Sequence, residues 1–205
     1  MVARLQNDVD HLLAQAGAGD SHALGDLLES YRNYLALLAR VQISRRLQRK
    51  LDAGDLVQET FLAAHRDWAS FQGSSERELV GWLRGILAGK LAKLVRSYLG
   101  TQRRNVLLER DLAEELDQSS RALDRGLFHK GDSPSVQVSQ REQGVLLADA
   151  LSELPEDYRE VLILRHLEGL SFPEVSQRMG RTLDAVKQLW VRALDRLRRS
   201  MRGDA

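Results

Sequence analysis

The segment from Leu170 to Leu194 constrains the fold more than any other part of the chain, because it encodes two helices joined by a tight turn. Ser171 and Glu174 form the S-x-x-E pattern of a capping box, so a helix is expected to begin directly after Ser171. Gly180 can adopt the left-handed conformation that ends a helix, and Thr182 can cap the helix that follows. A short helix, a glycine turn and a longer helix are typical of a helix-turn-helix motif.

The second helix of this motif has one apolar face and one charged face. Its apolar arc consists of Val186, Trp190, Ala193 and Leu197. Between residues 181 and 202 there are seven Arg or Lys residues and two Asp residues, a net charge of +5. Cations suit DNA phosphates, an amide suits base edges, and a small aliphatic side chain suits a thymine methyl group. We therefore predict DNA contacts from Arg181, Thr182, Asp184, Lys187, Gln188, Val191 and Arg192. The alternative is an ordinary surface helix whose charged side chains are only solvated.

Charge is separated along a chain whose overall net charge is only +1. Residues 84–104 contain six basic residues and no acidic one, whereas residues 109–117 contain five acidic residues and one arginine. A second basic block, far in sequence from the helix-turn-helix, indicates two separate contacts with an anionic partner.

The composition gives no support to an enzyme. The chain has no cysteine, which excludes disulfides, thiol catalysis and cysteine metal sites. Its five histidines are scattered without the spacing of metal ligands, and no nucleophile with an adjacent base can be recognised. We predict a protein without enzymatic activity, metal or cofactor. Because no apolar run approaches the length of a membrane span and no signal peptide opens the sequence, we also predict a cytoplasmic location without membrane insertion.

The remaining patterns predict an all-α fold of two small helical domains joined by a linker, since no segment alternates with a period of two. The first domain is predicted over residues 1–100, with helices over 4–16, over 21–38, from a cap at Asp52, and from a capping box at Ser75 and Glu78. Residues 101–137 form the predicted linker, which is partly helical near 105–118. The second domain is predicted over residues 138–205.

Leu62 lies among polar side chains on the outward face of the helix that follows Asp52. A single exposed leucine usually needs no explanation. Alternatively, Leu62 could be the apolar centre of a protein-binding patch whose polar rim includes Gln58 and Glu59.

Two segments of the chain resemble a known family. The run Asp52-Ala53-Gly54-Asp55-Leu56-Val57-Gln58-Glu59-Thr60-Phe61-Leu62 is similar to the core-polymerase-binding helix of bacterial sigma factors of the extracytoplasmic-function (ECF) group. The segment from Leu151 to Arg165, together with the helix-turn-helix, resembles region 4 of the same family. The two motifs follow each other in the same order as in the family. The resemblance around them covers about three quarters of the chain.

The resemblance implies a transcription initiation factor that binds core RNA polymerase and directs it to promoters by reading their minus-10 and minus-35 elements. It implies polymerase contacts from Asp55, Gln58, Glu59 and Leu62. It implies minus-10 contacts from the loop residues Phe71, Gln72 and Ser74 and from the helix residues Lys90, Lys93 and Arg96. The helix-turn-helix would read the minus-35 element, and an anti-sigma factor or other regulatory protein is a further candidate partner.

Two other interpretations stay open at this point. A helix-turn-helix regulator would bind duplex DNA without polymerase, usually as a two-fold dimer. A helical adaptor would bind only protein, and its function would not depend on Lys187 or Arg192.

Overall fold

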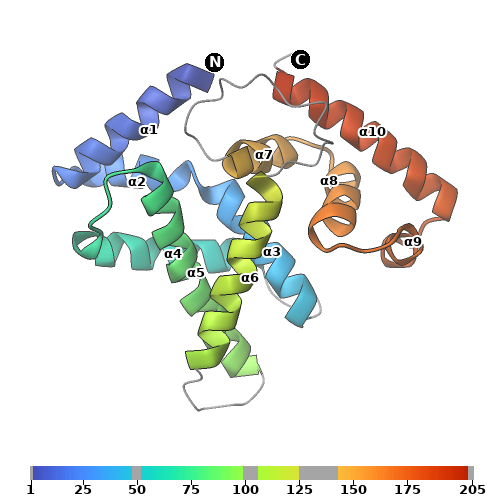
Figure 1. Cartoon of the computed structure of the whole chain (residues 1–205), viewed down its shortest axis with the longest axis horizontal. Coiled ribbons are helices and arrows are strands. Elements are labelled where there is room, and N and C mark those ends of the chain that lie inside the picture. The colour runs from blue at the N-terminus through green and yellow to red at the C-terminus, as the bar shows by residue number, and fades with distance from the viewer. Residues whose placement is uncertain (1, 48–51, 99–105, 125–142, 203–205) are drawn as a thin grey trace.

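Figure 1 shows the computed structural model of the chain, which describes residues 2–47, 52–98, 106–124 and 143–202. Throughout these ranges the structure is helical and has no strand, so the predicted all-α fold is confirmed. The elements are α1 (Val2–Gly17), α2 (Ser21–Glu29), α3 (Arg32–Leu47), α4 (Ala53–Asp67), a 3₁₀ turn η1 (Trp68–Ser70), α5 (Glu76–Tyr98), α6 (Val106–Asp124), α7 (Gln143–Ser152), α8 (Glu156–Leu162), a π-helical turn η2 (Ile163–Leu167), α9 (Phe172–Met179) and α10 (Leu183–Arg202).

The helices form two units that lie side by side. The first unit consists of α1 to α6 and the second of α7 to α10, with α10 at the right-hand edge of Figure 1. Helix α3 runs through the first unit, where it contacts α4, α5 and α6, and it also contacts α7 of the second unit. The buried apolar side chains of both units therefore belong to one continuous cluster.

The predicted helix over 21–38 is two helices, because the chain breaks between α2 and α3 at Ser30 and Tyr31. The hydroxyl of Ser30 donates to the carbonyl oxygen of Leu27 at 2.7 Å, which draws it into the last turn of α2. Tyr31 is fully buried and donates to the carboxylate of Glu76 at 3.0 Å. The apolar residues keep their helical spacing from α2 into α3, so the periodicity of the sequence did not reveal the break.

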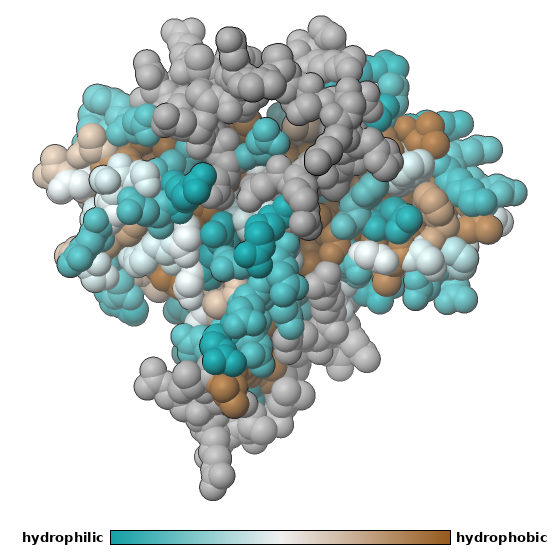
Figure 2. Space-filling model, viewed as in Figure 1, coloured by the Kyte–Doolittle hydropathy of each residue, from teal (hydrophilic) through white to brown (hydrophobic). Residues whose placement is uncertain are grey.

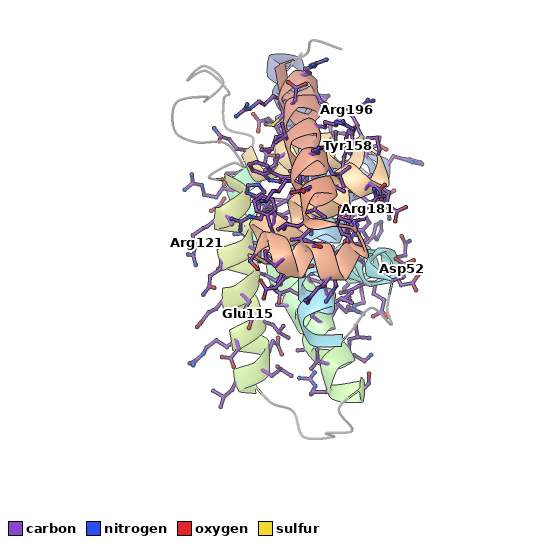
Figure 3. The ribbon with its side chains drawn as sticks, turned by 90° about the vertical axis from the view of Figure 1, so that its right-hand side faces the viewer. Asp52, Glu115, Arg121, Tyr158, Arg181 and Arg196 are labelled. Carbon is purple, nitrogen blue, oxygen red and sulfur yellow. The ribbon has the colours of Figure 1, made fainter. Side chains whose placement is uncertain are left out.

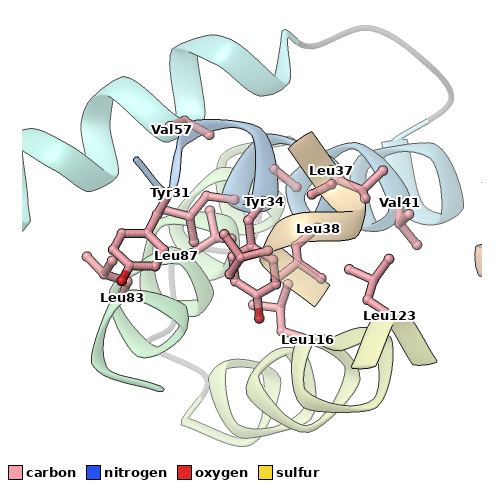
Figure 4. Packing of buried hydrophobic residues seen from close by; sticks show 14 of the residues in the cluster. Tyr31, Tyr34, Leu37, Leu38, Val41, Val57, Leu83, Leu87, Leu116 and Leu123 are labelled. Atoms are coloured by element: carbon pink, nitrogen blue, oxygen red, sulfur yellow. The ribbon is translucent and has the colours of Figure 1, made fainter. Parts of the chain in front are cut away.

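Helix α6 comes from the predicted linker but packs as part of the first unit. The prediction placed a partial helix near 105–118, and the structure extends it to Asp124. Its side chains Leu112, Leu116 and Leu123 are completely buried. Figure 4 shows Leu116 close to Tyr34 and Leu38 of α3, and Leu123 below the level of Val41. The outward face of α6 is largely hydrophilic in Figure 2.

A polar cluster fixes α6 to the rest of the first unit. The guanidinium of Arg84 on α5 donates from Nη1 to the Tyr34 hydroxyl at 3.0 Å and to the Ser120 hydroxyl at 2.9 Å. Its Nε lies 3.0 Å from the Asp117 carboxylate. Because Tyr34 and Ser120 are buried, these bonds satisfy polar groups that would otherwise be costly inside the fold. We call Arg84, Tyr34, Asp117 and Ser120 the Arg84 cluster.

Replacing Leu116 by alanine should lower the free energy of unfolding by about 2–5 kcal/mol, because it leaves a cavity in a fully buried site. Urea unfolding followed by circular dichroism measures this change. Leu107→Ala on the same helix is the matched control, since Leu107 is 61% exposed, and it should change stability by less than about 0.5 kcal/mol. Equal effects of the two substitutions would contradict the packing of α6.

The second unit is built around α10. Val175 of α9 and Val186, Ala193 and Leu197 of α10 are fully buried. The indole Nε1 of Trp190 donates to Nε2 of His166 at 2.9 Å, and its ring meets Phe172 edge-on at 5.4 Å between centroids. These contacts set the position of α10 on η2 and α9, so its opposite face points outward.

No helix within the described ranges is both long enough and apolar enough to cross a membrane.

Candidate protein and nucleic-acid interfaces

The outward face of α4 carries an uncovered leucine within a polar surface. Leu56, Val57 and Phe61 face the core, whereas Leu62 is 64% exposed. Asp55, Gln58 and Glu59 are also exposed, so the structure brings the four predicted polymerase-binding residues to one solvent-facing side of α4. Asp52 caps the helix by accepting from the Gly54 N–H at 2.8 Å, as its sequence position predicts. We call Asp55, Gln58, Glu59 and Leu62 the α4 patch.

Two basic side chains lie at the edge of the α4 patch. The sequence did not indicate that they would lie there. Arg32 of α3 donates to Gln58 at 3.4 Å, makes two bonds to Glu29, and lies 5.1 Å above the Phe61 ring. The Glu29 carboxylate keeps a pKa below its usual value because Arg32 donates hydrogen bonds to it. The predicted DNA residue Lys90 is half-buried and lies 3.7 Å from Glu59. The pairings of Arg32 with Gln58 and of Lys90 with Glu59 join residues far apart in the sequence, so only the three-dimensional fold could reveal them.

The loop between α4 and α5 contains three residues that are predicted to bind DNA. One of them is packed inward and two are exposed. Phe71 packs inward, with ring centroids 5.1 Å from both Trp68 and Trp82. Gln72 and Ser74 are exposed. Gly73 is closely enclosed, because a Cβ at this position would lie 2.4 Å from Cζ of Phe71 and 2.8 Å from Cβ of Glu78, so these neighbours would have to shift.

Glu78 holds this loop in place. Its carboxylate accepts from the Ser74 N–H at 2.8 Å, the Ser75 N–H at 3.1 Å and the Ser75 hydroxyl at 2.8 Å. These bonds favour the ionised form and lower the pKa of Glu78, with the Ser74 N–H as the largest cause. Because the pKa is lower in the folded state, this stabilisation is present above the ordinary pKa of a glutamate and is lost as the pH falls through the lowered value. The capping box that the sequence predicts therefore also fixes the loop conformation.

The three basic residues predicted on α5 differ in their exposure. Lys93 is exposed, Lys90 is paired with Glu59, and Arg96 is half-buried with its Nη1 shielded from solvent. Gly89, which stands next to Lys90 in the sequence, faces the Glu109 carboxylate of α6. Lys93 is thus the most accessible of the three cations.

The outer face of α10 presents the predicted base-reading residues to solvent. Asp184, Lys187, Gln188 and Arg192 are exposed, and Val191 is 58% exposed, a high value for an aliphatic side chain. Thr182 caps the helix by accepting from the Ala185 N–H at 3.3 Å. The preceding helix begins with the predicted capping box of Ser171 and Glu174 and ends at Gly180 with a φ of 64°.

Arg181 and Arg196 complete this charged surface. Arg181 lies 2.5 Å from the Asp157 carboxylate, so this predicted DNA residue is paired within the second unit. Figure 3 shows Arg196 and Tyr158 close together on the α10 side, and both line a groove of about 530 Å³ with Arg192 and Arg199. Sequence reasoning did not assign Arg196, although its spacing of four residues from Arg192 places it one turn further along the same helix.

Among the described residues, no group of three or more His, Asp or Glu side chains lies close enough to hold a metal ion.

Comparisons with known proteins match a separate family model to each of two parts of the chain. The family model of sigma-70 region 2 matches residues 30–101, and the model of sigma-70 region 4 matches residues 145–197. The first range contains the α4 patch and the loop, and the second contains the helix-turn-helix.

Curated relatives match over most of the chain. The ECF RNA polymerase sigma-E factor of Haemophilus influenzae is 30% identical over 183 residues, which are 89% of this chain and 89% of the relative. The ECF RNA polymerase sigma factor SigD of Mycobacterium bovis is 30% identical over 190 residues, covering 93% of this chain and 82% of the relative. Among solved structures, CnrH in complex with the cytosolic domain of CnrY is 25% identical and covers 97% of this chain and 99% of that chain, with a TM-score of 0.37.

Proposed function

The chain belongs to the extracytoplasmic-function group of sigma-70 RNA polymerase sigma factors, and we propose that it acts as a transcription initiation factor that directs core RNA polymerase to specific promoters. The observation that carries the proposal is that one chain keeps two unlike surfaces uncovered. The α4 patch has an apolar centre with a polar rim, which suits a protein, and the outer face of α10 is cationic, which suits DNA. The proposed partners are core RNA polymerase, promoter DNA and a regulatory protein such as an anti-sigma factor.

The second unit reads the minus-35 element in this proposal. Lys187 and Arg192 neutralise phosphates, Gln188 contacts base edges, and Val191 contacts a thymine methyl group. In this proposal the amino-terminal end of α10 enters the major groove first. The residues at this end are Arg181, Thr182 and Asp184. Arg181 would exchange its pair with Asp157 for a phosphate.

The first unit binds the melted minus-10 element. Gln72 and Ser74 are the exposed groups of the loop, Phe71 supports the loop from below, and Lys93 lies on the exposed side of α5. Lys90 and Arg96 complete the basic helix. In this proposal the free energy of binding unstacked bases drives local strand opening, so no catalytic group is needed. The proposed location is the cytoplasm, where bacterial polymerase and promoters are found.

Reconstituted transcription tests the proposal. Core polymerase and this protein should together initiate at a promoter chosen from the transcripts that rise when the protein is overproduced in cells. Core polymerase alone should not initiate there. A protein that never associates with core polymerase, or that binds duplex DNA equally well without it, would end the proposal.

Glu78→Ala should weaken promoter opening several-fold, because Ser74 and Ser75 lose the carboxylate that orders the loop. Permanganate reactivity of unpaired thymines measures the opening. Glu174→Ala removes the equivalent capping box in the second unit and is the matched control. It should weaken binding to duplex containing only the minus-35 element, whereas Glu78→Ala should leave that binding unchanged.

A further inference from the structure

We propose that His166 is a positioning residue for base recognition, and that its hydrogen bond with Trp190 sets the rotation of α10 about its own axis. We call the exposed residues Lys187, Gln188, Val191 and Arg192 the reading face of α10. The inference rests on the proposed function, because it concerns how the reading face meets the minus-35 element. It goes beyond that function by assigning the choice among base pairs to a contact that lies behind the reading face.

The turn η2 connects α8 with α9 at the right of Figure 1 and is π-helical, a rare geometry that is frequent at functional sites. The Glu168 N–H donates to the Ile163 carbonyl oxygen at 3.0 Å, which joins residues five apart instead of the four of an α-helix. One more residue therefore fits into this turn. Gly169 then adopts a φ of 78°, and the Leu170 N–H donates to the Leu164 carbonyl oxygen at 3.0 Å. These bonds end the helical segment shortly before α9 begins.

Two adjacent side chains of η2 each contact one helix of the helix-turn-helix. Arg165 donates to the Leu170 carbonyl oxygen at 3.1 Å and lies 5.1 Å from the centre of the Phe172 ring, at the start of α9. His166 accepts from the Trp190 indole of α10 at 2.9 Å, and the two rings are nearly parallel, with an interplanar angle of 17°. Phe172 meets the Trp190 ring edge-on. A continuous chain of contacts therefore runs from η2 through α9 to the inner side of α10.

The chemistry of the two rings fixes the direction of the hydrogen bond between His166 and Trp190. An indole N–H can only donate, so Nε2 of His166 is the acceptor and the neutral imidazole carries its proton on Nδ1. The bond is partly buried, and a buried donor that loses its partner lowers stability. A side chain without an acceptor at position 166 would therefore leave the Trp190 N–H unpaired and favour a displacement of Trp190 toward water.

Apolar packing alone does not fix the rotation of α10. Val186, Ala193 and Leu197 are fully buried before and after Trp190 in the sequence, but apolar contacts have no preferred direction. A hydrogen bond prefers a donor angle above about 150° and weakens steeply as this angle falls. The bond to His166 therefore adds direction to the apolar packing of α10.

A small rotation of α10 matters most for contacts with base edges. A helix with its side chains is about 10–12 Å across, so a rotation of about 20° moves the ends of the side chains by about 2 Å. Gln188 and Val191 stand within two residues of Trp190 and move with it. A displacement of this size breaks a hydrogen bond to a base edge, whereas the flexible stem of Lys187 can still reach a phosphate. Loss of the His166 bond should therefore weaken the choice among base pairs more than the binding of phosphates.

Promoter discrimination by the holoenzyme, the complex of core polymerase with this protein, tests the inference. The measured quantity is the ratio of its affinities for a promoter with an intact minus-35 element and for the same promoter with one base pair of that element changed. At sensitive positions the wild type should give a ratio of about 10 or more. His166→Phe keeps an aromatic ring but removes the acceptor, and it should lower the ratio by about fivefold or more. His166→Gln offers an acceptor oxygen near the end of its side chain and should restore most of the ratio.

The salt dependence of binding separates a positioning role from a general weakening. His166→Phe should leave the slope of log affinity against log salt unchanged, because it removes no phosphate contact. The matched control is His22→Phe, since His22 is an exposed histidine on α2, and it should change neither the ratio nor the slope. If His166→Phe lowers the affinities for both promoters equally, or if His166→Gln does not restore the ratio, the positioning role is overturned.

Nuclear magnetic resonance of the free full-length chain tests the contact itself. The chain has three tryptophans, so nitrogen labelling of the indoles gives three N–H signals, and Trp190→Phe identifies the signal of Trp190 by its loss. His166→Phe should shift this signal, and His166→Gln should reverse most of the shift. A Trp190 signal that His166→Phe leaves in place would show that the hydrogen bond is absent.

Trp190→Phe is a second route to the same loss, because it removes the donor and keeps an aromatic ring. It should lower the discrimination ratio as His166→Phe does, and the double variant should lower it no further, since both substitutions remove one bond. Fully additive losses would overturn the inference.

The wild-type measurement separates this inference from the proposed function. A wild-type holoenzyme that binds the intact and the changed promoter equally well would end the proposed reading of the minus-35 element. If the wild type discriminates and His166→Phe discriminates just as well, the positioning role falls and the sigma-factor function stands.

Discussion

Leu62→Asp should lower the affinity for core RNA polymerase by about 100-fold, or roughly 2.7 kcal/mol, a loss in the range of interface hot spots. Leu62 is the apolar centre of the α4 patch, and an acid there would have to give up its hydration inside an interface. Because the side chain is 64% exposed in the free protein, the fold should not change, and the melting curve of the variant should match that of the wild type. Fluorescence anisotropy of labelled protein titrated with core polymerase measures the affinity.

Leu107→Asp provides the control for this experiment. Leu107 on α6 is 61% exposed, so the substitution has the same chemistry in a similar environment outside the α4 patch. We expect its affinity for polymerase to stay within about twofold of the wild type. Equal losses from both substitutions would mean that added negative charge, rather than the loss of an apolar anchor, weakens binding.

Lys187→Ala combined with Arg192→Ala should weaken promoter binding strongly and change its dependence on salt. Each lost phosphate contact lowers the slope of log affinity against log salt by about one, so the double variant should lose about two. Holoenzyme binding to promoter duplex at several salt concentrations gives the slope. Because phosphates carry no sequence information, the loss should be nearly the same for different minus-35 sequences, whereas Gln188→Ala should relax the choice among them.

Arg110→Ala is the matched control for the cationic residues. Arg110 is an exposed arginine on α6, 3.7 Å from Glu114 one turn further along, and it lies outside both proposed DNA surfaces. Its removal lowers the net charge of the chain by one unit, as each of the single substitutions Lys187→Ala and Arg192→Ala does, but it should leave the slope unchanged. A slope that falls with Arg110 would indicate a diffuse charge effect and would contradict specific phosphate contacts from α10.

Local signals in the sequence predicted the parts of the fold that depend on neighbouring residues. The caps at Asp52, Ser75 and Ser171 act within three residues, so they were recognised and the structure has each of them. The exposure of Leu62 and Val191 followed from helical periodicity. Family resemblance added what these side chains do, which periodicity could not.

Contacts between distant segments left no such signal. The inward packing of Phe71 depends on Trp82 of the next helix, and the pairing of Lys90 with Glu59 joins two helices. Helix α6 looked like a linker because its composition is acidic, yet three leucines and the Arg84 cluster bind it into the first unit. The docking of the second unit on α3 depends on pairs far apart in the sequence, such as Asn33 and Asp149, so no local pattern could have indicated it.

A helix enclosed on two sides has a narrow tolerance to mutation. In a deep mutational scan, polar substitutions should be depleted at Val145, Leu147 and Leu151 alike. All three side chains are buried, and a buried polar group without a hydrogen-bond partner lowers stability. Larger side chains at Ala148 should also be depleted, because this side chain is only 2% exposed and additional atoms would overpack the contact between α7 and its neighbours. Selection on α7 would therefore act on the size of its side chains as well as on their polarity, on both covered sides of the helix.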